Sequence, residues 1–189
     1  KIWYTEGDSL SGYYNAWTAK NADISFREES AFSGDSGINI NADSAAFSVS
    51  PTLSYKEAVS FVSFSDADTD YSDYGTMSFY IRNESDDAVK LEQVKFLECS
   101  ALWYAPAIKD TLDCAADIPA DGEWHKITLD LNRVYHLGNE CSLSYSNDKL
   151  RKIRDIEFSF SSSDKNAKLS VDNISFAPSA DSVGTRYDI

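Results

Sequence analysis

The sequence predicts an all-β protein, a two-sheet antiparallel β-sandwich, and three observations support this prediction. Aromatic residues reach 13% of the 189 residues, with 11 Tyr and 10 Phe, which suit pleated strands. Met occurs once, while Ser, Thr, Asn and Asp, which bond to the nearby backbone and interrupt helices, are spread throughout. Hydrophobic residues recur with a period of two along most of the chain. The length and the 42% hydrophobic content suit one domain with a core of its own.

The alternating hydrophobic residues predict about nine or ten strands, which fits a sandwich. A continuously apolar run at 58–64 predicts a strand buried on both faces. Slips in the alternation between Leu91 and Val94, and again around Asp172, predict β-bulges. Asp148–Arg154 is expected to form a short helical turn. The other strands are expected at 24–26, 38–40, 47–49, 77–81, 127–131, 156–160, 169–171 and 174–176, with turn-forming clusters between them.

The charge balance restricts the partners. There are 17 basic and 31 acidic residues, which leaves a net charge of -14. Such a chain repels the phosphate backbone, so nucleic-acid binding is excluded, and acidic lipid surfaces are disfavoured for the same reason. No apolar run approaches the roughly 20 residues that a membrane span requires. The expected partner is neutral, cationic or a metal.

The cysteines indicate a structural role. The three are Cys99, Cys114 and Cys141, and an odd number cannot form a complete internal set of disulfides. One pair with one free thiol, or three reduced thiols, both fit the sequence. With only His125 and His136 beside them, a zinc site is not expected. The chain begins at Lys1 rather than Met, so we expect a mature or excised segment.

Four segments carry a family resemblance when they are taken in order. An acidic residue and a glycine precede an aromatic pair at the start of the chain, a Ser-Gly turn joins two strands, and a Gly-x-Trp motif opens a later strand. The segments are 4–14, 24–40, 121–131, and the pair 153–160 and 169–176. This set resembles the β-jelly-roll carbohydrate-binding modules of families 4, 9, 11 and 22. The resemblance implies jelly-roll topology over 1–178, with 179–189 as a loose C-terminal tail, while 50–120 matches no part of the family pattern.

The resemblance also implies a structural calcium ion that ties the first strand to the last. Glu6 and Asp172 are the implied side-chain ligands, with Asp8 as a further candidate, and backbone oxygens would come from the turn that includes Gly34 and Ser36. Calcium takes about 6–8 oxygen ligands of these kinds. A shift of the register by one residue puts Thr5 in place of Glu6. The simpler alternative is that Asp172 caps a bulge.

Aromatic residues in irregular stretches are candidates for stacking on sugar rings. Trp17 lies in a polar stretch where a core role is not evident. Trp103 and Tyr104 follow a strand and precede Pro106. The remaining two, Tyr71 and Tyr74, lie in an Asp-rich loop.

The polar faces of three predicted strands supply further candidates. Tyr80, Arg82, Asp130 and Glu157 each lie opposite the hydrophobic face of their strand. If these strands belong to one concave sheet, the four side chains line a groove that could bind sugar hydroxyls. An ordinary solvated sheet face is the alternative. Trp124 is expected in the core or at its rim.

The function implied by the resemblance is that of a non-catalytic module. It would bind a plant cell-wall β-glycan (β-glucan, xyloglucan, xylan or mannan) in a cleft, and it would target a covalently linked catalytic or scaffold module to that glycan. The expected protein is a secreted or cell-surface monomer. A small jelly-roll glycoside hydrolase is one alternative, for which Glu157 is the one glutamate on an open strand face. An adhesion or structural domain without sugar binding is the other.

Overall fold

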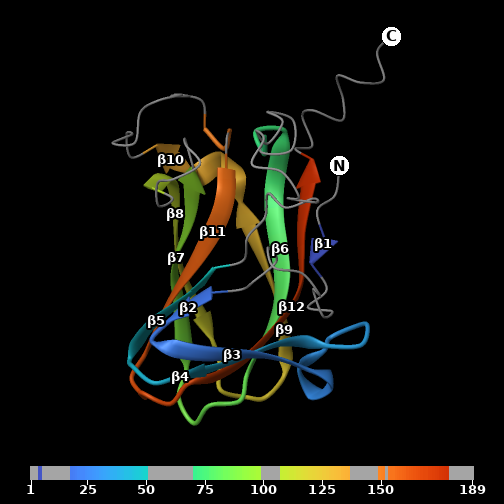
Figure 1. Ribbon diagram of the computed structural model, residues 1–189, viewed down its shortest axis with the longest axis vertical. Coiled ribbons are helices and arrows are strands. Elements are labelled where there is room, and N and C mark those ends of the chain that lie inside the picture. The colour runs from blue at the N-terminus through green and yellow to red at the C-terminus, as the bar shows by residue number, and fades with distance from the viewer. Residues whose placement is uncertain are drawn as a thin grey trace, which may run out of the picture.

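The computed structural model describes residues 4–5, 18–50, 70–98, 107–136, 149–151 and 153–178, and it contains two six-stranded sheets. Every strand pair is antiparallel, and the sheets pack against each other as a sandwich, seen along its edge in Figure 1. The predicted fold class is therefore confirmed. Among the described residues, no helix is long and apolar enough to cross a membrane.

Sheet A has the strand order β3-β4-β12-β6-β9, and β1 also pairs with β12. Its long central pair, β6 and β12, brings the middle of the chain beside its C-terminal part. The strands are β1 (Tyr4–Thr5), β3 (Ala22–Arg27), β4 (Gly37–Ala42), β6 (Tyr74–Asn83), β9 (Trp124–Asp130) and β12 (Lys168–Pro178). The short 3-10 turns η1 (Glu28–Ser30) and η2 (Leu131–Arg133) follow β3 and β9.

Sheet B has the strand order β10-β8-β7-β11-β5-β2. Its centre is formed by β8, β7 and β11, which stand together on the left of Figure 1. The strands are β2 (Thr18–Lys20), β5 (Ala46–Ser50), β7 (Val89–Glu98), β8 (Ala107–Ile118), β10 (Tyr135–His136) and β11 (Ile153–Ser162).

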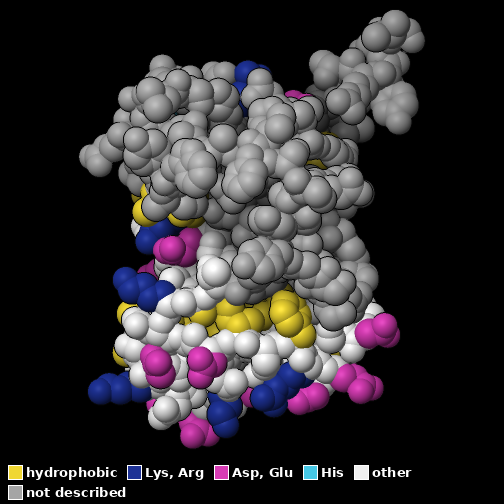
Figure 2. All heavy atoms as spheres, in the orientation of Figure 1, with side chains coloured by type: hydrophobic (Ala, Val, Ile, Leu, Met, Phe, Trp, Pro, Cys, Tyr) yellow, Lys and Arg dark blue, Asp and Glu magenta, His cyan; other side chains and the backbone are white. Residues whose placement is uncertain are grey.

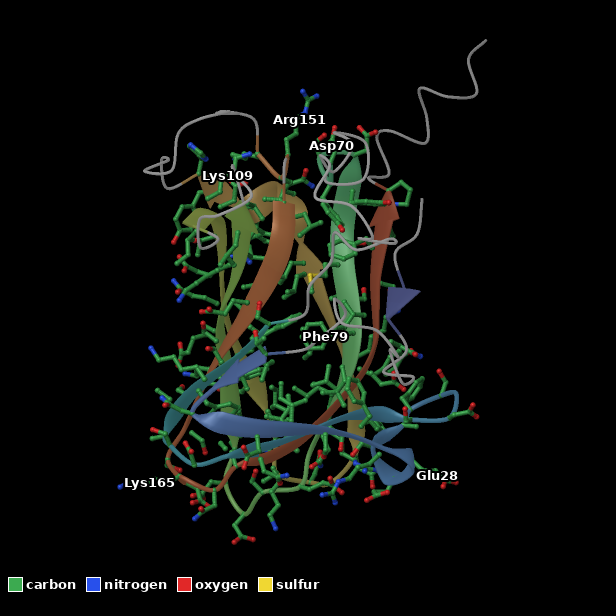
Figure 3. The ribbon with its side chains drawn as sticks, viewed as in Figure 1. Glu28, Asp70, Phe79, Lys109, Arg151 and Lys165 are labelled. Carbon is green, nitrogen blue, oxygen red and sulfur yellow. The ribbon has the colours of Figure 1, made fainter. Side chains whose placement is uncertain are left out.

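The core lies between the two sheets and is built from the predicted alternating residues. Phe79 of β6 meets Phe158 of β11 edge-on at a ring-centroid distance of 5.3 Å, which joins sheet A to sheet B. Both rings are buried, and Figure 3 shows Phe79 in the middle of the molecule. On the face drawn in Figure 2, acidic and basic side chains are interspersed around the lower end of the molecule rather than segregated by sign.

Both predicted bulges are confirmed by register shifts. The β7–β8 pairing shifts between Leu91 and Gln93, and the β12–β6 pairing shifts between Asp172 and Ser175. Asn173, inside the second bulge, has a φ of 54°, which Asn tolerates better than most residues.

Three predictions about the elements need correction or stay open. The described residues form twelve strands, more than expected, because β2 and β10 have only two or three residues each and β8 lacks a clear alternation. The helical turn expected at 148–154 is wrong at its end, since β11 already begins at Ile153. The strand expected at 58–64 lies outside the described residues.

Strand β8 has no clear alternation in the sequence. Lys109, Asp110 and Thr111 are polar and consecutive, yet all three are buried. Asp110 accepts a hydrogen bond from the backbone N–H of Leu150, and Lys109 donates one to the carbonyl of Arg151 at 2.6 Å. These bonds attach the segment before β11 to β8 at the end of the molecule where Figure 3 labels Lys109, Asp70 and Arg151.

Candidate functional site

The predicted groove of Tyr80, Arg82, Asp130 and Glu157 is wrong as a single surface. Tyr80 and Arg82 lie on β6 and Asp130 ends β9, both in sheet A, whereas Glu157 lies on β11 in sheet B. Because each side chain points away from the core of its own sheet, the two groups face opposite sides of the sandwich. Strand alternation places a residue on a face, but sheet membership depends on the pairing of distant strands.

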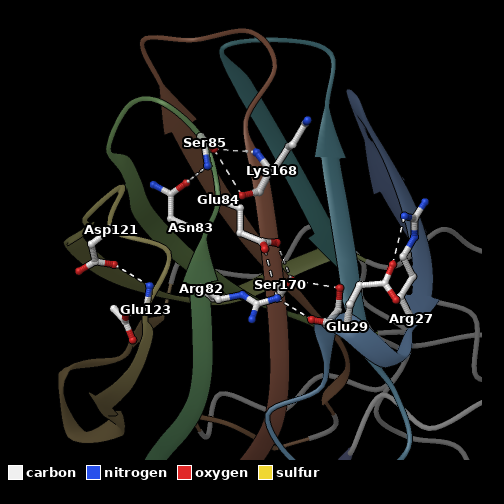
Figure 4. Close-up of polar contacts among 11 residues, drawn as sticks. Arg27, Glu29, Arg82, Asn83, Glu84, Ser85, Asp121, Glu123, Lys168 and Ser170 are labelled. Atoms are coloured by element: carbon white, nitrogen blue, oxygen red, sulfur yellow. Dashed lines mark hydrogen bonds and ion pairs between the residues drawn. The ribbon is translucent and has the colours of Figure 1, made fainter.

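Arg82 anchors the segment that crosses the outer face of sheet A. Its guanidinium donates to the backbone carbonyl of Glu29, pairs with Glu84 at 3.2 Å, and lies 4.9 Å from the ring centroid of Trp124. Figure 4 shows Arg82 between Glu84 and Glu29, with Ser170 beside them. The Ser170 hydroxyl donates to that of Ser30, so the 28–36 segment is fixed at several points. These contacts give Arg82 a structural role.

Tyr80 is covered by the same segment. Phe32 stacks on Tyr80 with ring centroids 3.7 Å apart and an interplanar angle of 11°, and it meets Trp124 edge-on at 5.6 Å. Trp124 was expected in the core or at its rim, but it is half-buried on the outer face of sheet A, across from Arg82. The ring of Phe32 is itself 42% exposed. An aromatic platform (Phe32, Tyr80 and Trp124) thus lies on the outer face of sheet A.

Tyr71 and Tyr74 are core residues, which corrects their prediction as ligand contacts. They are 1% and 9% exposed, and their rings lie 5.1 and 5.5 Å from that of Phe176. The Asp-rich composition around them indicated a loop, but burial of both rings against β12 leaves no face for a sugar.

Asp130 caps the turn that follows β9. Its carboxylate accepts hydrogen bonds from the backbone and the side chain of Asn132, both at 3.0 Å. It remains exposed, next to the open edge of sheet A. Capping explains its conformation without a ligand.

The outer face of sheet B carries a continuous row of polar side chains. Ser48, Ser159, Gln93 and Asp113 are cross-strand neighbours on β5, β11, β7 and β8. The Gln93 amide donates to Asp113 at 2.6 Å, and the Tyr135 hydroxyl donates to the same carboxylate at 3.3 Å. The sequence pattern placed Ser159 on the same strand face as Glu157, but it did not identify Asp113 or Tyr135, because β8 and β10 were not predicted as strands.

A second row lies beside the first and includes Glu157. Lys95 of β7 pairs with Glu157 of β11 at 3.3 Å, and the Ser159 hydroxyl donates to the same carboxylate oxygen. Thr111 lies across from Lys95 on β8, and its hydroxyl oxygen is buried without a hydrogen-bond partner among the described residues. The Ser161 hydroxyl donates to Glu92, so this face presents carboxylates, hydroxyls, an amide and an ammonium group.

Tyr135 supplies an aromatic ring at the edge of this polar face. It is 38% exposed, and its backbone pairs with Thr111. Desolvation, followed by the nearby negative charge of Asp113, raises the pKa of the Tyr135 hydroxyl above its ordinary value. The group therefore stays protonated near neutral pH and can donate a hydrogen bond.

Asp172 joins the last strand to the Ser-Gly turn. It is fully buried, and its carboxylate accepts the backbone N–H groups of Phe32, Ser33 and Asn173 at 2.8, 3.0 and 2.8 Å. The turn thus presents N–H donors to the carboxylate, as expected for the alternative in which Asp172 caps a bulge. The calcium ion that the resemblance implies stays a prediction.

Of the other implied calcium ligands, the structure describes only Gly34 and Ser36. Gly34 has a φ of 74° in the exposed part of the turn, and Ser36 is half-buried. Within the described part of the chain, no group of three or more His, Cys, Asp or Glu side chains is placed to hold a metal ion. Glu6 and Asp8, and the ligand candidates Trp17, Trp103 and Tyr104, lie outside the described residues.

A groove of about 310 Å³ separates the edges of the two sheets where β8 faces β9. Its polar lining includes Asp113, Lys126, Thr128 and Arg133, and Cys114 lies among its apolar residues. Burial raises the pKa of the Cys114 thiol to about 11, so this free thiol is protonated and unreactive near neutral pH. The groove adjoins the Asp113 end of the polar face on sheet B.

Comparisons with known proteins support the fold. No protein-family model matches the chain, and no curated protein matches its sequence. A family 11 carbohydrate-binding module from Clostridium thermocellum, solved in complex with a β-1,3-1,4-mixed-linked tetrasaccharide, matches with a TM-score of 0.57 and 16% identity over 94% of this chain and 96% of that one. A xylan-binding family 22 module from Paenibacillus barcinonensis matches with a TM-score of 0.52 and 14% identity, covering 95% and 97%.

A third solved structure places the same fold inside an enzyme. An agarase matches with a TM-score of 0.59 and 14% identity, over 94% of this chain but only 24% of that one. These identities are low, so the similarity lies in the fold. The chain has the jelly-roll sandwich of the carbohydrate-binding modules, as the sequence resemblance predicted.

Proposed function

We propose that this domain is a non-catalytic carbohydrate-binding module that binds a plant cell-wall β-glycan on the outer face of sheet B. The observation that carries the proposal is the ordered row of Ser159, Gln93, Asp113 and Tyr135 across this face, on a fold shared with modules solved as glycan binders. Carboxylate, amide and hydroxyl groups bind vicinal sugar hydroxyls, and the Tyr135 ring offers a surface for the apolar face of a pyranose.

The polar groups of this face already have partners within the protein. Lys95 pairs with Glu157, and the Asp113 carboxylate accepts hydrogen bonds from two neutral donors. Asp113 keeps its negative charge, which opposes an anionic polymer, whereas a neutral polysaccharide can hydrogen-bond to these groups without bringing a charge of its own. This favours β-glucan, xyloglucan, xylan or mannan over charged polymers.

The role that follows is targeting rather than chemistry. The agarase, and a Clostridium thermocellum xylanase solved with a family 22 binding module joined to its GH10 module, carry this fold as part of a longer chain. They support a module fused to an enzyme, in a secreted or cell-surface protein. Holding that enzyme near its substrate raises the effective concentration. A hydrolase built on Glu157 is the competing function, although Lys95 and Ser159 both occupy its carboxylate.

Native affinity electrophoresis on gels containing each of the four soluble glycans tests the proposal. We expect selective retardation by at least one glycan and about tenfold weaker binding for Asp113→Ala and Gln93→Ala. Asp23→Ala, an exposed carboxylate on β3 of the other sheet, should bind as the wild type does. Absence of retardation by all four glycans would contradict the proposal, and release of reducing sugar from any of them would favour the hydrolase.

Calcium remains part of the proposal. The carboxylate of Asp172 lies at the junction of β12 and the 32–36 turn, where its Oδ2 accepts the N–H groups of Phe32 and Ser33 and its Oδ1 accepts that of Asn173. A calcium ion at this junction would add Asp172 to ligands from Glu6 and Asp8. We expect thermal unfolding of the wild-type protein to move to higher temperature with millimolar calcium and to lower temperature with a chelator. Equal midpoints under both conditions would contradict the site.

A further inference from the structure

We propose that the aromatic platform on sheet A is a second sugar-binding site, on the opposite side of the sandwich from the polar face of sheet B. This inference rests on the proposed function, since it assumes a glycan ligand. The site consists of the exposed side chain of Phe32, stacked on Tyr80, together with Lys126 and Thr128 of β9, the cross-strand partners of Tyr80 and Ser78. Its ligand class is a neutral oligosaccharide that stacks the C–H face of one sugar ring on Phe32.

The orientation of Phe32 makes its ring available. One face of the ring stacks on Tyr80 at 3.7 Å, and Trp124 approaches it edge-on at 5.6 Å. Phe32 is nevertheless 42% exposed, so solvent reaches this residue although Tyr80 covers one face of its ring. An aromatic side chain that is this accessible and also held in place loses little conformational entropy when a ligand stacks on it.

The support beneath the ring is rigid. The Asp172 carboxylate fixes the backbone N–H groups of Phe32 and Ser33, and Arg82 holds the carbonyl of Glu29 (Figure 4). Gly37 closes the segment, and it packs so tightly that a Cβ atom there would lie 1.7 Å from the carbonyl oxygen of Ser30. The platform is therefore preorganised by buried contacts at both ends of the 28–36 segment.

Hydrogen-bonding groups continue from the platform along the same face. Tyr80 pairs with Lys126, and the next outward pair is Ser78 with Thr128, whose hydroxyls are 3.1 Å apart. Lys126 and Thr128 are exposed, and the Lys126 ammonium lies 5.9 Å from the Tyr80 ring centroid. An apolar ring flanked by hydroxyl and ammonium donors matches a pyranose, which has an apolar face and hydroxyls around its rim.

The surrounding charges favour a neutral ligand over an ion or a second copy of the chain. Arg82 pairs with Glu84, and Arg27 pairs with Glu29 at 3.5 Å, so these charges compensate each other. Two copies would each bring a net charge of -14, which opposes self-association through this face. A neutral oligosaccharide meets neither obstacle. With both faces active, one domain could hold two glycan chains and gain avidity from them.

Titration with cellotetraose, followed by backbone amide chemical shifts, tests the second site. We expect two groups of perturbed amides, one around Gln93 and Asp113 and one around Phe32 and Lys126. Phe32→Leu keeps an apolar side chain over Tyr80 but removes the flat ring. It should abolish the amide shifts around Phe32 and Lys126, or weaken the affinity that they report at least fivefold, and leave the shifts around Gln93 and Asp113 unchanged. Phe26→Leu is the matched control, because Phe26 is also exposed (38%) but lies on β3 outside the platform.

The outcomes separate the two proposals. Perturbation confined to sheet B, unchanged in Phe32→Leu, would overturn the second site and leave the proposed function intact. Perturbation confined to Phe32 and Lys126 would support the second site and contradict the assignment of glycan binding to sheet B. If neither surface gives a saturating response to cellotetraose, xylotetraose or mannotetraose, both the second site and the proposed function are overturned. Equal weakening by Phe32→Leu and Phe26→Leu would overturn the assignment of the second site to the Phe32 ring.

Discussion

The carboxylate of Asp172 accepts the backbone N–H of Phe32 at 2.8 Å across a separation of 140 residues in the chain. Through this bond the bulge of β12 fixes the segment that places the Phe32 ring over Tyr80. The buried carboxylate of Asp172 thus also positions the exposed side chain of Phe32, which is a candidate for ligand binding.

Replacement of Asp172 by Asn should lower the free energy of unfolding by about 1–3 kcal/mol, because buried N–H groups lose a charged acceptor. Urea denaturation measures this change. Asp164→Asn is the control, since its carboxylate also accepts a backbone N–H, from Asn166, but in an exposed turn. A wild-type midpoint for Asp172→Asn would contradict the role assigned to the buried carboxylate.

Gly37 should not tolerate a side chain. A Cβ there would lie 1.7 Å from the Ser30 carbonyl oxygen, so Gly37→Ala must displace the 28–36 segment. Gly122→Ala is the matched variant: nothing lies within 4 Å of its Cβ position, and its φ of 72° alone costs roughly 1–2 kcal/mol. We expect Gly37→Ala to be clearly the less stable of the two by thermal unfolding, and the reverse order would contradict the packing described.

Ala115 has a φ of 47°, a left-handed conformation that glycine adopts more easily. Ala115→Gly relieves this strain but gives the unfolded chain more conformational entropy, so the two effects oppose each other. The free energy of unfolding should therefore stay the same or rise by up to about 1 kcal/mol. Ala116→Gly, at the next position in β8, should be destabilising. Calorimetric midpoints compare the two, and a larger loss in Ala115→Gly would refute the strain.

Cys114 should resist alkylation in the folded protein. Because burial raises the pKa of its thiol from 9.0 to about 11, the thiolate fraction at pH 8 is very small. The sign for stability follows: the unfolded thiol ionises first, so this contribution is present below pH 9 and is lost as the pH rises towards 11. Iodoacetamide labelling of a Cys99→Ser, Cys141→Ser variant, with and without urea, measures the difference. Equal rates would contradict the burial.

Asp121 should titrate below the ordinary range for a carboxyl group. The backbone N–H of Glu123 is the main cause of the lowered pKa, and the imidazole of His125, at 2.9 Å, adds to it. The stability gained from this group is present above its unfolded pKa and is lost as the pH falls through its folded pKa. In carboxyl-carbon NMR titrations, His125→Ala should raise the pKa only in part. If the pKa of Asp121 returned fully to its ordinary value in His125→Ala, His125 would be the principal cause, which would contradict the role assigned to the Glu123 N–H.

Local sequence features determined the strands and their irregularities. The alternation of Met77, Phe79 and Ile81 predicted β6 because a half-buried strand places every second side chain in the core. The phase slips at Leu91 and Asp172 predicted two bulges for the same reason, since one extra residue reverses the faces of a strand. The net charge also led to the prediction that nucleic acids are not partners, and four ordered motifs indicated the jelly-roll fold.

The tertiary structure alone decided which candidate side chains share a face. Tyr80 and Glu157 have the same local pattern, yet they lie on opposite sheets, because antiparallel pairing joins strands that are distant in the chain. Tyr71 is in the core because β12 passes over it, and β8 is a strand although its buried Lys109 and Asp110 break the alternation. Long-range pairing energies, rather than any local property of these residues, place the polar row on sheet B and the Phe32 platform on sheet A.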